Sequence, residues 1–260
     1  MITDPTQLAL AAASGGLVSL LLTVFGGGGS VLAVPLLLYV VGVRDPHVAI
    51  GASAAGVALN ALTGLVGHAK DGRVRWPCAL TFAGFGVVGA LAGSSLALRI
   101  DGESLLIFFA GAMALVGAAM LRPARSLGDP DARLSLRGVP VLAASGVGVG
   151  AASGFFGIGG GFLIVPGLTA ATGMTLALAQ ASSLVSVAAF GTTTALNYAV
   201  AGRIDWAIVA AMTVGGVAGA AAGRPLARRL ATRAPLARRL FAGLILIVAV
   251  YVAARATGVV

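Results

Sequence analysis

Ten apolar stretches divide the chain into two groups of five. They cover residues 7–25, 31–43, 47–69, 76–98 and 104–121, then 138–156, 162–174, 176–200, 206–223 and 237–254. Eight of them hold 18 residues or more. About 20 apolar residues in a helix span the roughly 30 Å hydrocarbon core of a bilayer. The pattern therefore predicts an all-α polytopic membrane protein.

A polar segment separates the two groups. Residues 122–138, RPARSLGDPDARLSLRG, hold four Arg, two Asp and two Pro. Such a composition is typical of an exposed loop. We therefore expect an N-terminal repeat over 1–121, a linker over 122–138 and a C-terminal repeat over 139–260, joined in one transmembrane domain.

The two groups also match in sequence. GGGGSVLAVP begins at Gly26 and GIGGGFLIVP begins at Gly157, an offset of 131. DGRVRW, ending at Trp76, matches AGRIDW, ending at Trp206, at an offset of 130. Further on, GVVGALAGSSLALR (86–99) and GVAGAAAGRPLARR (216–229) are identical at nine of fourteen positions. These matches indicate an internal duplication.

The start of each repeat is unusual. Residues 7–43 are nearly all apolar, and one helix of that length would be almost twice as long as the hydrocarbon core is thick. The stretch after the Gly run, 31–43, is too short to cross alone. We therefore expect the Gly-rich turn to lie inside the membrane, as a hairpin or a discontinuous helix pair.

The basic residues test this interpretation. If each hairpin counts as two passes, 13 Lys and Arg fall on one side and 4 on the other. If it counts as one pass, the division is 9 to 8. Because basic loops stay in the cytoplasm, five passes per repeat are favoured. An odd number gives repeats of inverted topology, a cytoplasmic linker and both termini outside, as in many secondary transporters.

Composition excludes a soluble domain. The chain is 58% hydrophobic and 10% charged, with a mean hydropathy of +1.02, whereas a soluble domain has about 25% charged residues. The formal charge of +9 comes from short basic segments between apolar stretches, so nucleic-acid binding is disfavoured. The single cysteine, Cys78, excludes an internal disulfide and a cysteine metal cluster.

The two Gly runs are the strongest candidates for a substrate site. A helix that starts inside the membrane has unpaired N–H groups, which an anion can accept. Glycine lets the backbone approach a ligand, and the helix dipole adds positive charge. Ser30 is a candidate cap for the helix after the first run. The alternative is that these glycines only permit tight packing. The candidates are Gly26, Gly27, Gly28, Gly29, Ser30, Gly159, Gly160 and Gly161.

Small polar residues in the third stretch of each repeat could complete a pocket. Neutral donors hydrate an anion's oxygens without trapping it as a buried Arg would. The alternative is that these side chains bond their own backbone or a neighbouring helix. The candidates are Ser53, Asn60, Thr63, Ser182, Ser183, Thr193 and Asn197.

No residue pattern points to an enzyme or a cofactor. All eight Asp and Glu lie in termini or predicted loops, so no buried carboxylate marks a cation or proton pathway. No metal-ligand cluster, nucleotide motif or nucleophile with its base is visible. We expect no cofactor and no bound metal.

The paired motifs resemble the sulfite exporter TauE/SafE family. The resemblance rests on the two Gly runs with their V-P ends, an A-S pair after each (Ala52 with Ser53, Ala181 with Ser182) and the G-R-x-x-W segments. It implies transport of a small sulfur-containing anion, such as sulfite, thiosulfate or an organosulfonate, across a prokaryotic inner membrane.

The sequence thus predicts a secondary transporter that works by alternating access. Its expected partners are a small anionic substrate and the lipid bilayer, with no nucleic acid. An anion channel is the first alternative, and a membrane-embedded enzyme or assembly factor is the second.

Overall fold

The computed structural model describes residues 4–121, 128–129, 132, 138–230 and 234–256. Most of the predicted linker lies outside the described residues. The described part is helical, and its one β-bridge joins Asp129 to Met174. The helices are α1 (Pro5–Phe25), the 3-10 helix η1 (Gly26–Leu32), α2 (Ala33–Tyr39), α3 (Pro46–Lys70), α4 (Trp76–Ala97), α5 (Gly102–Leu121), α6 (Val139–Phe156), α7 (Gly161–Thr172), α8 (Leu176–Val200), α9 (Trp206–Leu230) and α10 (Ala234–Ala256).

The helices confirm the predicted all-α polytopic membrane fold. In the described part of the chain, eight helices are long and apolar enough to cross a membrane. The exceptions are α2, with 7 residues, and α7, with 12, which at 1.5 Å per residue are too short to cross. Each follows a Gly run, so the predicted helix break is confirmed in both repeats.

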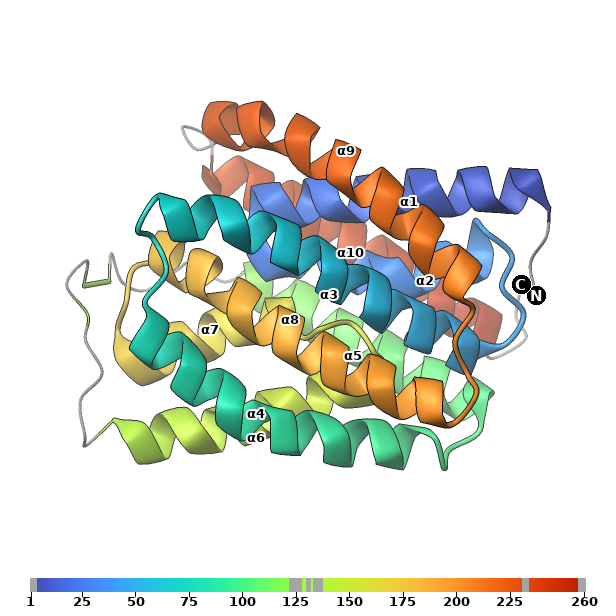
Figure 1. The fold of residues 1–260 in the computed structure, drawn as a ribbon, viewed down its shortest axis with the longest axis horizontal. Helices are drawn as coiled ribbons and strands as arrows, with labels where there is room; N and C mark the ends of the chain where they lie inside the picture. Colours follow the sequence, from blue (N-terminus) through green and yellow to red (C-terminus); the bar gives the residue numbers. More distant parts are fainter. Residues whose placement is uncertain (1–3, 122–127, 130–131, 133–137, 231–233, 257–260) are drawn as a thin grey trace.

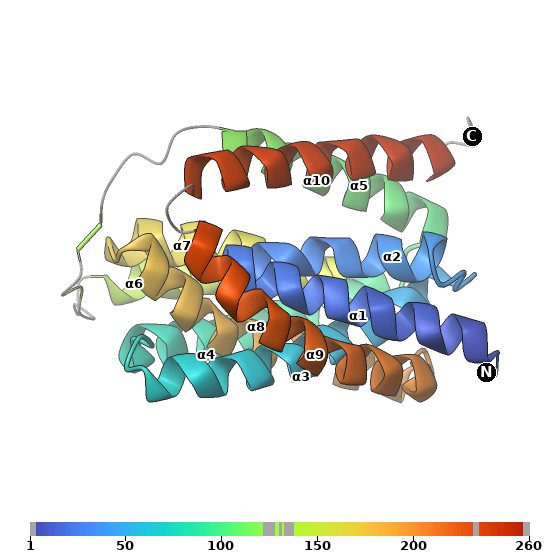
Figure 2. The ribbon, with the colours of Figure 1, turned by 90° about the horizontal axis from the view of Figure 1, so that it is seen from above.

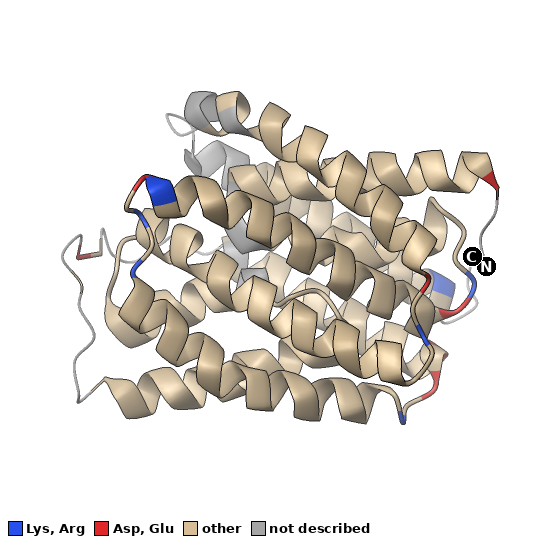
Figure 3. Ribbon diagram, viewed as in Figure 1, with Lys and Arg blue, Asp and Glu red and all other residues tan. Residues whose placement is uncertain are grey.

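Apart from η1 and the turn between α6 and α7, the chain connections lie at the two ends of the helix bundle (Figure 1). One end carries the start of α1, the end of α10 and the loops before α3, α5 and α9. The described charged residues gather at the two ends, with uncharged helix between them (Figure 3). Helix α1 runs away from the end that carries the termini, and α6 runs towards it (Figure 1).

Local sequence explains where helices begin near these ends. Asp45 precedes α3 and accepts a hydrogen bond from the His47 amide at 2.8 Å. Asp101 precedes α5, and the Ser104 amide donates to its carboxylate at 2.8 Å. This bond to the charged form lowers the pKa of Asp101. Both residues therefore act as N-terminal caps.

Two helix pairs repeat the same packing. Helix α1 packs against α9, and α6 packs against α4. Glycine allows backbone contact in each pair, since Gly219 lies against the Gly16 backbone and Gly93 lies against the Ala151 backbone. The GxxxG spacings of α4 and α9 therefore serve helix packing.

Helices α3 and α8 form the centre of the molecule. They are the most buried of the candidate membrane spans. In the apolar part of α3, 67% of the residues are buried, and in that of α8, 56% are. They also pack against each other, while α5 and α10 pair in a separate layer on one face (Figure 2). Any site near the middle of the molecule is therefore bounded by α3 and α8.

Candidate functional site

The second Gly segment, residues 157–161, lies where α3 crosses α8. A Cβ atom on Gly159 would contact Val187 of α8 at 2.9 Å and Val57 of α3 at 3.1 Å. These two valines are matching positions of the duplication, at an offset of 130. The segment therefore sits at the point where corresponding parts of the two repeats meet.

The backbone of this segment requires glycine. Gly157, Gly159 and Gly160 have φ values of +66°, +63° and +64°, which L-residues rarely adopt. Neighbours also approach closely, since a Cβ on Gly157 would overlap Ile50 and one on Gly160 would lie 2.5 Å from Ser153 Cβ. The left-handed turn ends α6 and starts α7, whose N-cap residue is Gly160.

Hydroxyl groups border the same turn. Ser53 of α3 is fully buried and donates to the Gly157 carbonyl at 3.2 Å. Ser153 of α6 is also fully buried, lies against Gly160, and its Oγ has no hydrogen-bond partner among the described residues. No side chain caps α7. The start of α7 thus combines a helix N-terminus with an unpaired buried hydroxyl.

The first Gly segment, residues 26–30, adopts a different conformation. It begins the 3-10 helix η1, which packs against α1, α7 and α8. Gly29 lies against the backbone of Leu21 and Leu22, so a side chain there would collide with α1. The contact between η1 and α7 brings both Gly segments into one region of the molecule.

The predicted cap at Ser30 is wrong. The N-cap residue of α2 is Leu32, without a side-chain cap, and Ser30 lies fully buried inside η1. The 3-10 turn carries the helix start past Ser30. Pro35 is the third residue of α2, whereas Pro166 is the sixth residue of α7 and therefore interrupts its interior.

A repeated F-A-G sequence brings one buried phenylalanine to each Gly segment. Phe109 of α5 and Phe241 of α10 occupy matching positions at an offset of 132, and both are 2% exposed. Phe109 packs edge-on against Phe156, which precedes Gly157, with ring centroids 5.7 Å apart. Phe241 lies against Gly28. The outer helix layer therefore covers both Gly segments.

Most of the predicted small polar residues bond elsewhere in the protein. Thr63, Ser183 and Thr193 donate to carbonyls of their own helices. The Ser182 hydroxyl accepts from the Arg75 amide at 3.0 Å, and Asn197 donates to Ser94 and Ser95 of α4. These contacts support the structural alternative for the five residues.

Asn60 differs from these five residues, because its side chain makes no hydrogen bond within the described part of the protein. It is 1% exposed, and neither atom of its amide has a partner among the described residues. The same holds for the hydroxyls of Ser19, Ser153, Ser186 and Thr194, which the site prediction did not include. Serine and threonine are common in membrane helices, so only their burial and missing partners distinguish these hydroxyls.

The described acidic residues lie outside the interiors of the helices. Of the described Asp and Glu, only Glu103 lies within a helix, in its first turn. Arg203 forms an ion pair with Asp45 at 2.6 Å at the end of the bundle that carries the termini. The described residues contain no His, Cys, Asp or Glu group that could hold a metal ion.

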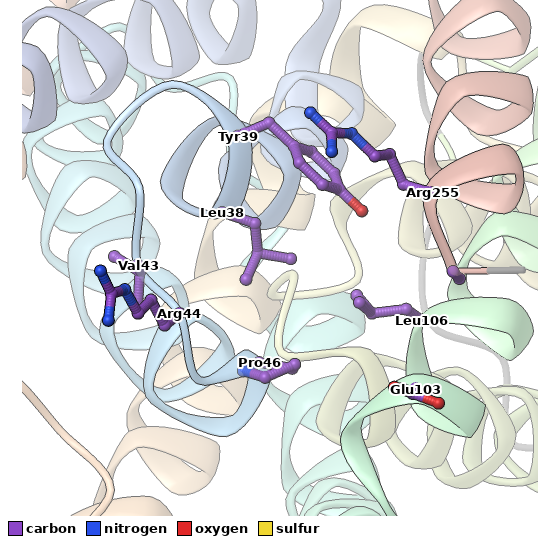
Figure 4. Close-up of a pocket in the computed structure, with 9 residues that line it drawn as sticks. Leu38, Tyr39, Val43, Arg44, Pro46, Glu103, Leu106 and Arg255 are labelled. Carbon is purple, nitrogen blue, oxygen red and sulfur yellow. The ribbon is translucent and has the colours of Figure 1, made fainter. Parts of the chain in front are cut away.

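A cavity of about 270 Å³ lies near the ends of α2 and α10. Figure 4 shows Tyr39 beside Arg255, with Glu103 across the opening. The floor is apolar, with Leu38 and Leu106, while the exposed rim carries both signs of charge. This surface hollow lies apart from the α3–α8 crossing and is a weaker candidate for substrate than the Gly segments.

The fold and its relatives place the chain among multi-pass membrane transporters. A family model described as sulfite exporter TauE/SafE matches residues 11–252. The chain belongs to the sulfite exporter TauE/SafE family, which confirms the resemblance seen in the sequence.

Individual relatives are also named as transporters. The chain is 48% identical over 240 residues to a probable membrane transporter protein of Xylella fastidiosa (strain 9a5c), with 92% of each chain covered. It is 25% identical over 204 residues to the probable membrane transporter protein YdhB of Bacillus subtilis (strain 168), covering 76% of this chain and 80% of that one. No solved structure matches the chain.

Proposed function

We propose that this protein is a secondary transporter that moves sulfite, thiosulfate or an organosulfonate across the prokaryotic inner membrane by alternating access. The main support for this proposal is that Gly159 lies between Val57 of α3 and Val187 of α8, while η1 packs against α7. Because η1 also packs against α7 and α8, one anion could contact the backbone of both Gly segments.

The chemistry of this region suits an oxyanion. The N-terminus of α7 provides partial positive charge, and the Ser153 hydroxyl is available as a donor. Neither Gly segment, 26–30 nor 157–161, contains a charged residue. An anion held only by neutral donors can leave again, as a transport cycle requires.

An inverted pair of repeats explains how access could alternate. The opposite directions of α1 and α6, and the matched α1–α9 and α4–α6 pairs, support repeats over 1–121 and 139–260. In such transporters the substrate site lies at the repeat interface near the midplane. Rocking of one repeat against the other would expose the site to each side in turn.

Counterflow in proteoliposomes tests this function. Vesicles are loaded with an unlabelled anion and diluted into buffer that contains a trace of the same anion in labelled form. The measurement is repeated for sulfite, thiosulfate, sulfate and two-carbon sulfonates. We expect saturable uptake of a sulfur-containing anion that is accelerated by internal anion. Flux without accelerated exchange would indicate a channel, and no flux of any of these anions would indicate an enzyme or assembly factor.

A further inference from the structure

One buried corner of the protein is polar in the first repeat and apolar in the second. It lies where α9 meets α1 and α3. Asn60 of α3 packs directly on Gly216 of α9. At the matching positions, offset by 130, Phe190 of α8 packs directly on Gly86 of α4. The duplication has therefore kept the contact and exchanged a phenyl ring for an amide.

Ser19 of α1 belongs to the same corner. One turn earlier, Gly15 of α1 and Gly56 of α3 both lie against Met212 of α9. The three helices run in the same direction (Figure 1), so one turn further on α1 and α9 come Ser19 and Gly216. In the second repeat the position of Ser19 is taken by glycine, at residue 150, whose neighbour is the Gly86 backbone.

The polar side-chain groups of Ser19 and Asn60 make no hydrogen bond to the described part of the protein. Ser19 and Asn60 are each 1% exposed, and the Ser19 hydroxyl and both Asn60 amide atoms have no partner among the described residues. The matching corner of the second repeat is apolar. There Phe190 is fully buried, and its ring centroid lies 6.2 Å from that of Phe82. Unpaired polar groups destabilise a buried site, so a ligand that satisfies them is the physical reason to keep them.

The corner is close to the proposed anion site. Ser53, Val57 and Asn60 are spaced four and three residues apart on α3, so they follow one face of that helix. Ser53 donates to the Gly157 carbonyl and Val57 touches Gly159. Asn60 is the next position on this face, one turn beyond the second Gly segment.

The hydrogen-bonding capacity of the corner defines its ligand. The Asn60 amide offers two N–H donors and one acceptor oxygen, and the Ser19 hydroxyl can donate as well. A fully ionised anion would leave the Asn60 oxygen unpaired. A singly protonated oxyanion provides acceptor oxygens for the donors and one O–H for the Asn60 oxygen.

We propose that Asn60 and Ser19 form a subsite that binds a small oxyanion in its singly protonated form. The proposal rests on the proposed function and narrows its substrate class, because an organosulfonate without an O–H satisfies the corner less well than protonated sulfite. It also makes the two repeats unequal, since Phe190 closes the matching corner of the second repeat.

The test uses the full chain in detergent, with sulfite and methanesulfonate as probes at mildly acidic pH. Asn60→Leu replaces the amide with an apolar side chain of similar shape. Without anion its melting temperature should rise, because the unpaired amide is gone. Its affinity for sulfite, measured by calorimetry, should fall by about tenfold or more, or about 1.4 kcal/mol, and its affinity for methanesulfonate should fall less.

Asn197→Leu is the matched control. The Asn197 amide donates to Ser94 at 2.8 Å and Ser95 at 3.0 Å, so this variant should melt at a lower temperature than the wild type. Ser19→Ala provides a second variant that removes fewer atoms, and it should also weaken sulfite binding.

The outcomes separate the subsite from the general function. If Asn60→Leu melts at a lower temperature, as Asn197→Leu should, the amide is structural. Unchanged sulfite affinity in Asn60→Leu, or in Ser19→Ala where Asn60→Leu does not fold, means that the corner holds water only. Equal losses for both probes refute the protonated form. Each of these results overturns the subsite alone, whereas a wild type that binds neither probe, and does not bind thiosulfate, overturns the proposed function with it.

Discussion

At the scale of single residues, the second Gly segment depends on backbone conformation rather than on side chains. Gly160 holds φ at +64° and lies against Ser153. A left-handed conformation costs an L-residue about 1–2 kcal/mol. Glycine therefore keeps the start of α7 open for a ligand and also stabilises the turn.

Gly160→Ala should lower the free energy of unfolding by about 1–2 kcal/mol and weaken anion binding. The added methyl group would lie 2.5 Å from Ser153 Cβ and would occupy the proposed site. Gly111→Ala is the control, since a Cβ there meets nothing within 4 Å. Thermal unfolding and calorimetry in detergent measure both effects. Equal anion affinity in the two variants would show that the anion does not bind at this turn.

The sequence identified the Gly segments but not the bonds made by single side chains. Ser53 and Ser183 occupy matching positions, yet Ser53 donates to Gly157 whereas Ser183 donates to Gln180 of its own helix. The rotation of each helix about its axis decides between these bonds, and an all-apolar helix gives little sign of that rotation in its sequence. For the same reason, the sequence did not indicate Ser153 and Ser186 as buried hydroxyls without a hydrogen-bond partner.

At the scale of helices, close backbone contact holds the repeats together. In the α4–α6 pair, Gly89 and Gly93 of α4 lie against the backbones of Val147 and Ala151. The α1–α9 pair has the same design. Apolar burial alone does not drive helix association in lipid, so this close fit supplies much of the attraction.

Gly93→Val should therefore destabilise the protein far more than Gly84→Val on the same helix. A side chain at Gly93 would overlap the Ala151 backbone, whereas Gly84 is exposed with nothing within 4 Å of a Cβ. Overpacking a tight contact costs about 1–3 kcal/mol. Melting temperatures in detergent compare the two variants, and an equal effect would contradict the α4–α6 packing.

Helix positions followed from hydrophobicity, but the shape of each break did not. The predicted stretches 47–69 and 176–200 became α3 and α8, with ends that agree within one residue. Both breaks were also expected from the length of the apolar runs. Glycine permits both 3-10 and left-handed backbone, so the sequence could not show that η1 takes the first form and that Gly157, Gly159 and Gly160 take the second.

At the scale of the whole molecule, the distribution of charge suggests its orientation. Figure 1 places the start of α1 and the end of α10 together, and the α3–α4 loop with Lys70 and Arg73 at the other end. Helix α5 ends and α6 begins at this second end, and the sequence between them holds four Arg. We expect that end in the cytoplasm.

Single cysteines in a Cys78→Ala background should show this orientation. Thr6, Glu103 and Lys70 are exposed positions at the two ends. Cysteines at Thr6 and Glu103 should react with an impermeant thiol reagent added to intact cells, and one at Lys70 should react only after the membrane is opened. Labelling of Lys70 from outside, with protection of the other two, would reverse the orientation.

A crystal structure with selenite, the heavier analogue of sulfite, would show directly where the anion binds. We expect strong anomalous density for one selenium atom between η1 and residues 157–161, near the α3–α8 crossing. Density in the cavity beside Arg255, or no ordered selenium at a selenite concentration that saturates binding, would contradict the assignment of the anion site to the two Gly segments.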